Sequence, residues 1–190
     1  MCGITGFYSK IDKGLVDHNL VSSANSFQHR GPDSEGYYFK TQNGHESVSG
    51  SNEDIQNSLA LKIGIGFKRL SILDVENGSQ PFTSPDGRYT AVFNGEIYNF
   101  NELKRDLSEW SFNTSSDGEI IIPMFIKYGI NFPKKLNGMF AICIYDSKED
   151  QIILVRDQVG VKPLYIYEDS NIFAFSSEIK SLLKFGSIKK

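Results

Sequence analysis

Hydrophobic positions along the chain fall into short runs separated by polar turn residues, and most of these runs have the length and composition of β-strands. Turns are predicted between them at Pro85-Asp86-Gly87, at Asn94-Gly95 and at residues 157–160. Many short strands with helices grouped between them predict a layered α+β fold. The predicted strands are CGITGFYS, LALKIGIGF, RLSILD, RYTAVFN, GMFAICIYD, QIILVRD, PLYIYE and IFAFSSE.

Between the predicted strands, some segments have apolar residues at helical spacing and are predicted to be helices. The segment LVDHNLVSSANSFQ predicts a helix over residues 15–28, and SSEIKSLLKF predicts a short helix that closes the fold. Two further helices are expected to begin near Asn99 and near Ser116, each followed three residues later by a glutamate. Pro123 lies past the first turn of the second of these helices and predicts a kink. Residues 40–57 are polar and weakly patterned, which predicts a disordered surface excursion.

Composition and charge narrow the class of protein. A chain of 190 residues with 39% hydrophobic residues predicts one globular domain over residues 1–190. The net charge of -3 leaves no basic patch for nucleic acid. No apolar run reaches the ~20 residues of a membrane span, and the N-terminus lacks the features of a signal peptide. Cys143 lies in an apolar strand and is expected to be an inert core thiol. Two cysteines without a signal peptide do not make a disulfide framework, so we expect a reducing, cytoplasmic setting.

Cys2 is the first candidate for chemistry. If Met1 is removed, Cys2 carries a thiol and a free α-amine on one residue. An amine with a pKa of roughly 7.7–8.0 can exchange a proton with a thiol of pKa roughly 8.5 near neutral pH. Such a residue combines nucleophile and base, as in N-terminal threonine enzymes. The alternative is a small buried residue at the start of a strand, and position alone somewhat favours this alternative.

Three other positions leave a structural and a chemical interpretation open. Asn94-Gly95 follows an apolar strand and is typical of a hairpin turn, yet an asparagine amide beside a glycine N–H also suits an oxyanion hole. Arg69 is either a solvated charge at a strand end or a clamp for a carboxylate. Asp117 either complements a helix dipole or binds an ammonium group.

Taken together, these positions fall in motifs that resemble the glutamine amidotransferase domain of the asparagine synthetase (glutamine-hydrolysing) family, of the N-terminal-nucleophile type. The combination of HRGPD, NGEIYN and RDxxGxKPLY points to this branch rather than to amidotransferases of sugar or purine pathways. The resemblance extends from Cys2 to about Leu183. The matching segments are MCGI, HRGPDSEG, RLSILD, QPF, FNGEIYN, SDGE, LNGMFA, RDQVGVKPLY and FSSEIKSLL.

The resemblance implies a four-layer αββα sandwich of two antiparallel sheets and a glutaminase that starts at Cys2 after removal of Met1. Glutamine would be hydrolysed to glutamate and ammonia through a thioester on Cys2, and His29 would be structural. The implied catalytic residues are Cys2, Asn94 and Gly95, and the implied glutamine-binding residues are Arg69, Leu70, Ser71, Ile72, Leu73, Glu96 and Asp117.

Three departures from the family pattern qualify this expectation. Phe67 stands where the family commonly has histidine, and Gly118 stands where it usually has threonine or cysteine. The synthetase half with its SGG motif for ATP is absent from these residues. The resemblance therefore implies a separate synthetase partner or a missing C-terminal domain, which would carry ATP and Mg²⁺, and no cofactor or metal in this chain. The alternative is a non-catalytic subunit that binds glutamine or serves as a scaffold.

Overall fold

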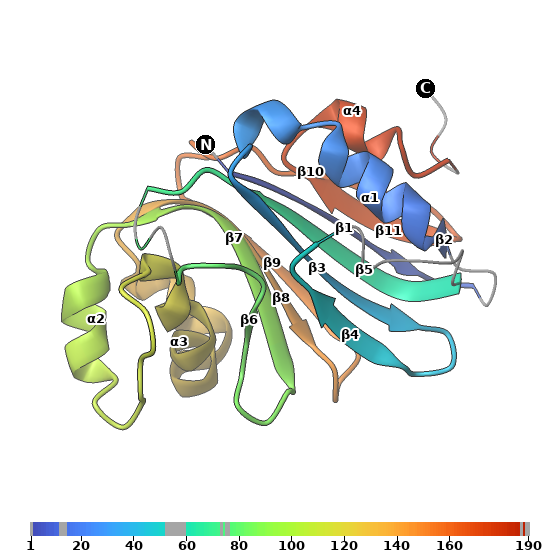
Figure 1. Cartoon of the computed structure of the whole chain (residues 1–190). Coiled ribbons are helices and arrows are strands. Elements are labelled where there is room, and N and C mark those ends of the chain that lie inside the picture. The colour runs from blue at the N-terminus through green and yellow to red at the C-terminus, as the bar shows by residue number, and fades with distance from the viewer. Residues whose placement is uncertain are drawn as a thin grey trace. The chain divides into compact units, whose positions relative to one another are not determined.

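The computed structural model describes residues 2–11, 15–51, 60–72, 74, 77–186 and 188. The chain forms two compact units, one of residues Met1–Leu70 with Pro163–Lys190 and one of residues Ser71–Lys162. Each unit is built around its own antiparallel sheet (Figure 1). Leu73, one of the residues predicted to bind glutamine, lies outside the described residues.

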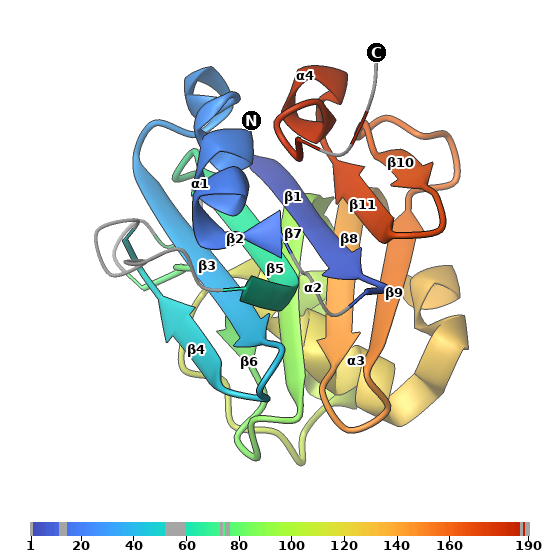
Figure 2. The same ribbon diagram turned by 90° about the vertical axis from the view of Figure 1, so that its right-hand side faces the viewer.

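The first unit contains a seven-stranded sheet in the order β10-β11-β1-β5-β3-β4, with β2 paired to β5 (Figure 2). All of its described strand pairs are antiparallel. Its elements are β1 Gly3–Ser9, β2 Leu15–Val16, α1 Asp17–Asn25, a 3₁₀ turn Gln28–Arg30, β3 Ser34–Thr41, β4 Glu46–Ser49, β5 Ala60–Arg69, β10 Tyr165–Glu168, β11 Ile172–Ser176 and α4 Ile179–Leu182.

Helices α1 and α4 cover one face of this sheet (Figure 1). Leu20 and Phe27, from α1 and the turn after it, pack with Phe7 of β1 in a fully buried cluster. Gly64 of β5 leaves room for the ring of Phe7, because a Cβ there would lie 2.8 Å from the ring. Burial of these aromatic and aliphatic side chains holds the helices on the sheet.

The second unit contains a four-stranded antiparallel sheet in the order β6-β7-β8-β9. Its apolar cluster joins Phe93 of β7 and Phe140 of β8 to Ile121 and Met124 of α3, so the helices cover one face here too. Its elements are β6 Phe82–Thr83, β7 Tyr89–Ile97, α2 Phe100–Asp106, a 3₁₀ turn Asp117–Ile120, α3 Ile121–Tyr128, a 3₁₀ segment Gly129–Lys135, β8 Gly138–Asp146 and β9 Gln151–Arg156.

The α+β class and the two antiparallel sheets are confirmed, and several element predictions need correction. LALKIGIGF and RLSILD are not two strands, because β5 runs without a break to Arg69 and residues 70–72 form no strand. Four described strands, β2, β3, β4 and β6, were not predicted. Residues 46–49 of the supposed excursion pair with β3 as β4, while residues 52–57 lie outside the described part of the chain.

The helix predictions hold in outline and miss at the ends. Leu15–Val16 pairs with β5 as a short strand, so α1 starts later than predicted. The helices expected near Asn99 and Ser116 begin there, and the Ser116 hydroxyl accepts a hydrogen bond from the N–H of Gly118. Pro123 lies in the first turn of α3, directly after a 3₁₀ segment. The change from 3₁₀ to α geometry takes the place of the predicted kink.

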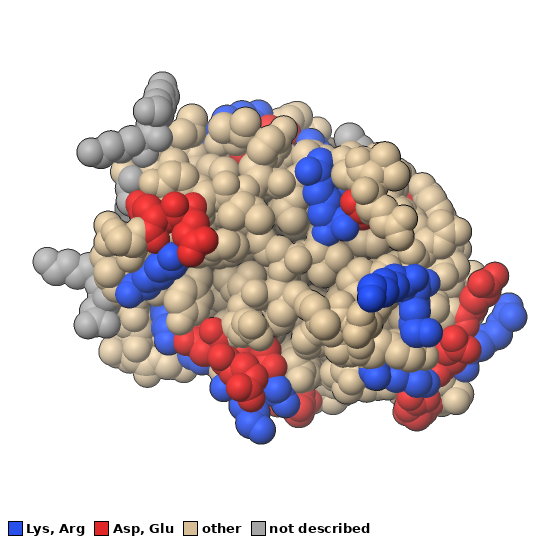
Figure 3. Space-filling view, turned by 180° about the vertical axis from the view of Figure 1, so that it is seen from behind, with Lys and Arg blue, Asp and Glu red and all other residues tan. Residues whose placement is uncertain are grey.

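The surface drawn in Figure 3 carries both signs of charge. Lys and Arg side chains lie mostly among Asp and Glu rather than in one basic field on that face (Figure 3). No helix in the described part of the chain has the length and apolar character needed to cross a membrane.

Candidate active site

Cys2 lies immediately before β1, against the residue that follows β5. The N–H of Leu70 donates a hydrogen bond to the Cys2 Sγ (3.4 Å), and the thiol lies 3.6 Å from the Leu70 carbonyl oxygen as a donor. The Nε of Arg30 donates to the Cys2 carbonyl (3.0 Å). Because β1 and β5 pair with Gly3 opposite Lys68, the sheet itself places the thiol beside Leu70. Cys2 is half-buried, so it is not a closed core residue like Cys143.

The surroundings of Cys2 disfavour the thiolate form of its side chain. Burial raises the pKa of the Cys2 thiol, while the hydrogen bond from Leu70 and the charge of Arg69 act in the opposite direction with smaller effect. The thiolate is the nucleophilic form of cysteine. Cys2 therefore needs a nearby base before it can attack an electrophile.

Arg69 is the last residue of β5 and is only 5% exposed, so it is not the solvated strand-end charge that was one interpretation of the sequence. The HRGPD turn packs on its backbone. The N–H of Asp33 donates to the Arg69 carbonyl (3.0 Å), and a Cβ on Gly31 would overlap the backbone of Lys68. Gly31 is thus required by the close approach of two chain segments, and the turn fixes the end of the strand that leads to Leu70.

Asn94 lies inside β7, opposite Ala141 of β8, and is 1% exposed. Its Nδ2 has no hydrogen-bond partner among the described residues. Leaving a buried donor unsatisfied costs about 1–3 kcal/mol, so such groups are rare unless function requires them. The Asn94 amide is therefore a buried donor that is free to bind an acceptor outside the fold's own hydrogen bonds.

Gly95 follows Asn94 in the middle of a strand, so the predicted turn at Asn94-Gly95 is wrong. The strand continues to Ile97 and pairs with β8 over its whole length, with Gly95 opposite Phe140. A Cβ on Gly95 would overlap the carbonyl oxygen of Met139. The glycine is explained by the close approach of β8 and not by turn geometry.

Asp117 lies at the start of the 3₁₀ turn before α3 and is 5% exposed. Its Oδ2 accepts a hydrogen bond from the N–H of Ile97 (2.8 Å), which holds it at the end of β7. Burial raises the pKa of the Asp117 carboxyl, and the charge of Glu96 raises it further, while backbone hydrogen bonds lower it. Within the second unit, β7 thus carries Asn94, Gly95 and Glu96 and also holds Asp117 at its end.

The loop after β5 contains the other predicted substrate-binding residues. Leu70 contacts Cys2 as described above, Ser71 is half-buried, and the side chain of Ile72 is 69% exposed. Asp74 of the RLSILD motif accepts a hydrogen bond from the N–H of Ser115 (2.7 Å), which ties this loop to the segment that leads to Asp117.

The two substitutions relative to the family pattern have different packing roles. Phe67 is fully buried within β5. At position 118, a Cβ would lie 2.6 Å from Cε2 of Phe82 and 2.7 Å from Cε1 of Phe93. The two phenylalanine rings occupy the space that a larger residue at Gly118 would need.

We therefore expect Gly118→Thr to lower the stability of the chain. Forcing extra atoms into a filled core typically costs 1–3 kcal/mol, and here the added atoms meet two rings. Thermal unfolding measures the effect. Gly44→Thr is an unsuitable control because of its positive φ, whereas Gly50→Thr, where nothing lies within 4 Å of the added Cβ, tests a glycine in open space. Equal melting temperatures of Gly118→Thr and the parent would contradict the expected clash.

The sequence did not reveal two side chains that hold the backbone at or next to candidate catalytic residues. Gln80 is buried and binds both backbone groups of Phe93, and Arg30 binds the carbonyl of Cys2. Both lie in motifs that the sequence displays, QPF and HRGPD, but nothing in the residue pattern reveals their partners. His29 lies 3.0 Å from a carboxylate oxygen of Glu178 and is well exposed, and its structural role stays a prediction.

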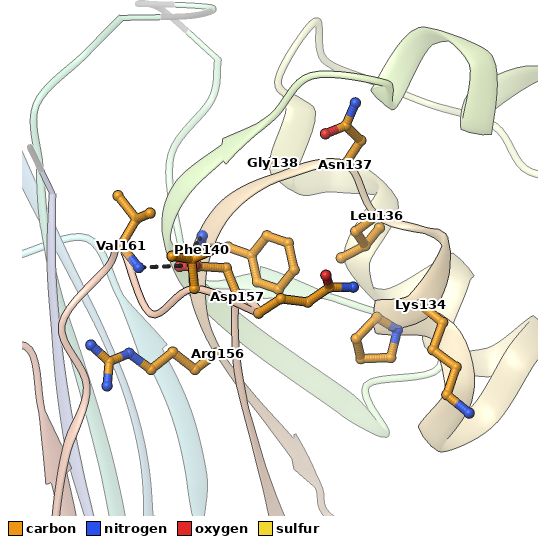
Figure 4. A pocket seen from close by; sticks show the side chains of 11 residues that line it. Lys134, Leu136, Asn137, Gly138, Phe140, Arg156, Asp157 and Val161 are labelled. Atoms are coloured by element: carbon orange, nitrogen blue, oxygen red, sulfur yellow. Dashed lines mark hydrogen bonds between the residues drawn. The ribbon is translucent and has the colours of Figure 1, made fainter.

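A pocket of about 410 Å³ lies in the second unit at the ends of β8 and β9 (Figure 4). Phe140, which lines it, is the cross-strand neighbour of Gly95. Asp157 shapes the adjoining loop, because its carboxylate accepts from the N–H groups of Val161 (2.8 Å, dashed in Figure 4) and Lys162 (3.0 Å). The pocket is thus lined by β8, the strand that pairs with β7, and by no described residue of β7 itself.

The fold is that of the amidotransferases. Glutamine phosphoribosylpyrophosphate (PRPP) amidotransferase from B. subtilis, complexed with ADP and GMP, matches 97% of this chain and 44% of its own with a TM-score of 0.77 at 22% identity. The model of the glutamine amidotransferase domain matches residues 50–190. The chain therefore belongs to the glutamine amidotransferase domain family.

The curated relatives extend the match to the N-terminal segment. Asparagine synthetase [glutamine-hydrolyzing] 2 of Bacillus subtilis (strain 168) is 38% identical over 185 residues, which cover 96% of this chain and 22% of the relative. Asparagine synthetase [glutamine-hydrolyzing] 1 of Saccharomyces cerevisiae is 37% identical, with 96% of this chain and 29% of the relative covered. The chain spans about a quarter of the length of these relatives.

Proposed function

We propose that the chain is a glutaminase, which hydrolyses glutamine to glutamate and ammonia through a thioester on Cys2. The observation that carries the proposal is the buried, unpaired Nδ2 of Asn94 beside Gly95. If stability were the only requirement, this buried amide would be expected to have a hydrogen-bond partner or to be replaced by an apolar side chain. The oxyanion of the tetrahedral intermediate in amide hydrolysis requires such a hydrogen-bond donor.

In the proposed mechanism the α-amine of Cys2, freed by removal of Met1, takes the thiol proton, and Sγ attacks the side-chain amide carbon of glutamine. The amide Nδ2 of Asn94 and the N–H of Gly95 would stabilise the oxyanion of the tetrahedral intermediate. Collapse of the intermediate breaks the C–N bond, and the proton carried by the amine leaves with ammonia. Water then attacks the thioester, which releases glutamate and restores the thiol.

Two charged side chains would orient the substrate. Arg69 would bind the α-carboxylate of glutamine, since a guanidinium fork suits a carboxylate. Asp117 would bind the α-ammonium, with Glu96 adding negative charge. Backbone groups of Leu70, Ser71 and Ile72 would contact the bound glutamine; for Leu73 the same role follows from the family resemblance alone. Both side chains are only 5% exposed, which supports these roles, because a charge in a water-poor site attracts an opposite charge more strongly than one in bulk water.

The ammonia would be passed to a synthetase, as a partner protein or as a further domain. The curated relatives are asparagine synthetases of which this chain spans about a quarter, which supports such a partner. Hydrolysis by the proposed route uses protein groups and water, so ATP and Mg²⁺ would belong to the synthetase. We expect the glutaminase rate to rise when that synthetase is added.

Incubation of the purified chain with L-glutamine tests the proposal. Glutamate and ammonia should form in equal amounts, and acid quenching during turnover should trap a glutamyl group on the peptide that begins with Cys2. Intact-mass analysis should show that active preparations have lost Met1. Full activity with Met1 retained would rule out the α-amine as the base. Glutamine binding without hydrolysis, even with the synthetase present, would instead favour a non-catalytic binding module.

The raised pKa of Asp117 predicts an acid limit to activity. Only the ionised carboxylate binds an ammonium, so kcat/KM should fall as the pH drops through the pKa of Asp117, which burial places above the ordinary aspartate value of about 3.9. Asp117→Asn should lower kcat/KM and remove this limb of the profile. Asp106→Asn, at an exposed residue of α2, is the control. An unchanged acid limb in Asp117→Asn would show that another group titrates there.

A further inference from the structure

The carboxamide of Gln80 makes a paired contact with the residue before Asn94. Its Nε2 donates to the carbonyl of Phe93 (3.2 Å), and its Oε1 accepts from the N–H of Phe93 (2.7 Å). Gln80 is buried, and so is Phe93. One side chain therefore satisfies both backbone groups of a single strand residue.

This contact takes the place of strand pairing on one edge of β7. The short strand β6 pairs with β7 through Phe82 opposite Ala91, and the same antiparallel register would bring position 80 opposite Phe93. Pro81 lies between and has no N–H to continue a ladder. The side chain of Gln80 supplies the donor and the acceptor that the backbone of a longer β6 would otherwise have provided.

The ring of Phe93 is fixed as well as its backbone. Phe93 belongs to the apolar cluster under the helices, and its ring lies so near Gly118 that a Cβ there would approach within 2.7 Å. Successive side chains of a strand point to opposite faces of the sheet. Holding Phe93 by its backbone and by its ring therefore sets the direction in which the next residue, Asn94, presents its amide.

We propose that Gln80 is a positioning residue for Asn94: its carboxamide clamps the main chain of Phe93 and so aims the unpaired Asn94 amide. The proposal rests on the proposed function for its catalytic consequence. Gln80 itself touches no reacting atom, and its effect is transmitted through Phe93. Displacement of a catalytic group by 1 Å can cost as much as about 100-fold in rate.

The kinetic test uses Gln80→Met, which keeps the length of the side chain and removes both hydrogen bonds. We expect kcat to fall about tenfold or more, with KM for glutamine nearly unchanged, because an oxyanion donor acts in the transition state. Gln151→Met, at an exposed glutamine of β9, is the matched control and should leave both constants unchanged. A melting curve of each variant confirms folding. Gln80→Glu, which keeps one acceptor for the Phe93 N–H, is used if Gln80→Met does not fold.

A double-mutant cycle separates positioning from general support of the fold. If Gln80 acts through Asn94, then Gln80→Met should cause little further loss of kcat in an Asn94→Ala background, whereas independent effects would add. Equal losses in both backgrounds, or an unchanged kcat in Gln80→Met, would overturn the proposal.

The side-chain amide signals of Asn94 in ¹⁵N-labelled protein provide a readout that does not depend on activity. They can be assigned by their loss in Asn94→Ala. We expect them to shift in Gln80→Met and not in Gln151→Met. Unmoved signals would overturn the positioning role even in an active enzyme. Shifted signals in a chain without glutaminase activity would support the positioning role and refute the proposed function separately.

Discussion

Replacement of Cys2 by alanine is expected to abolish glutamate release while glutamine binding remains. The substitution removes the Sγ that would form the thioester and leaves Arg69 and Asp117 in place. Loss of a nucleophile that acts together with its base typically costs 10⁴-fold or more in kcat, so we expect a fall of about that size. A coupled glutamate assay measures the rate, and titration calorimetry measures glutamine binding to the variant.

Cys143→Ala is the matched control for this experiment. Cys143 is fully buried in β8, and burial raises the pKa of its thiol far above the ordinary range. Its removal should lower the melting temperature through the cavity that it leaves and should not change kcat. Release of glutamate by Cys2→Ala at the parental rate would exclude the thioester mechanism. Loss of activity in Cys143→Ala with an intact fold would mean that the role of the two thiols has been misassigned.

Asn94→Ala is expected to lower kcat by about 10²–10³-fold, or about 3–4 kcal/mol of transition-state stabilisation, with little change in KM. Its stability should change little, because the Nδ2 that it removes makes no hydrogen bond among the described residues. Steady-state kinetics together with thermal unfolding test both parts of the expectation.

Asn99→Ala is the matched control for Asn94→Ala, because it should change stability and not kcat. Asn99 donates to the Lys135 carbonyl (3.0 Å) and accepts from the N–H of Asn137 (2.9 Å), so its side chain supports the fold. This variant should lose stability and keep its kcat. If Asn94→Ala lost stability instead and kept full activity, the free amide of Asn94 would have no catalytic use.

The sequence predicted the fold class well because most strands are apolar runs with clear turn residues between them. It failed where tertiary pairing overrides local pattern. Residues 46–49 are mostly polar, and they form a strand by pairing with the edge of β3. The Asn94-Gly95 pair has the composition of a hairpin turn, yet the neighbouring β8 keeps it extended. The local preference of a segment carries no information about the neighbouring strand with which it pairs, here β3 or β8.

For the candidate site, the motifs pointed to candidate residues but did not reveal the surroundings of those residues. The structure shows that Arg69 and Asp117 are buried and that the Asn94 Nδ2 has no partner in the described part of the chain, which no residue pattern can reveal. The contacts of Gln80 and Arg30 were also unpredictable, since each joins a side chain to a backbone group distant in sequence. Gly118 departs from the family pattern, which usually has threonine or cysteine there. The structure shows that two phenylalanine rings pack tightly against this glycine.

The close approach of β7 and β8 bears on how active and inactive relatives can be told apart by sequence. A Cβ on Gly95 would overlap the Met139 carbonyl, and a Cβ on Gly138 would overlap the Glu96 carbonyl from the opposite strand. Backbone spacing alone therefore retains both glycines, even in a descendant that has lost its chemistry. Asn94 has no such constraint, because its Nδ2 donates no hydrogen bond to the described residues. Drift at Asn94 with Gly95 intact would mark a degenerate amidotransferase more reliably than the glycine could.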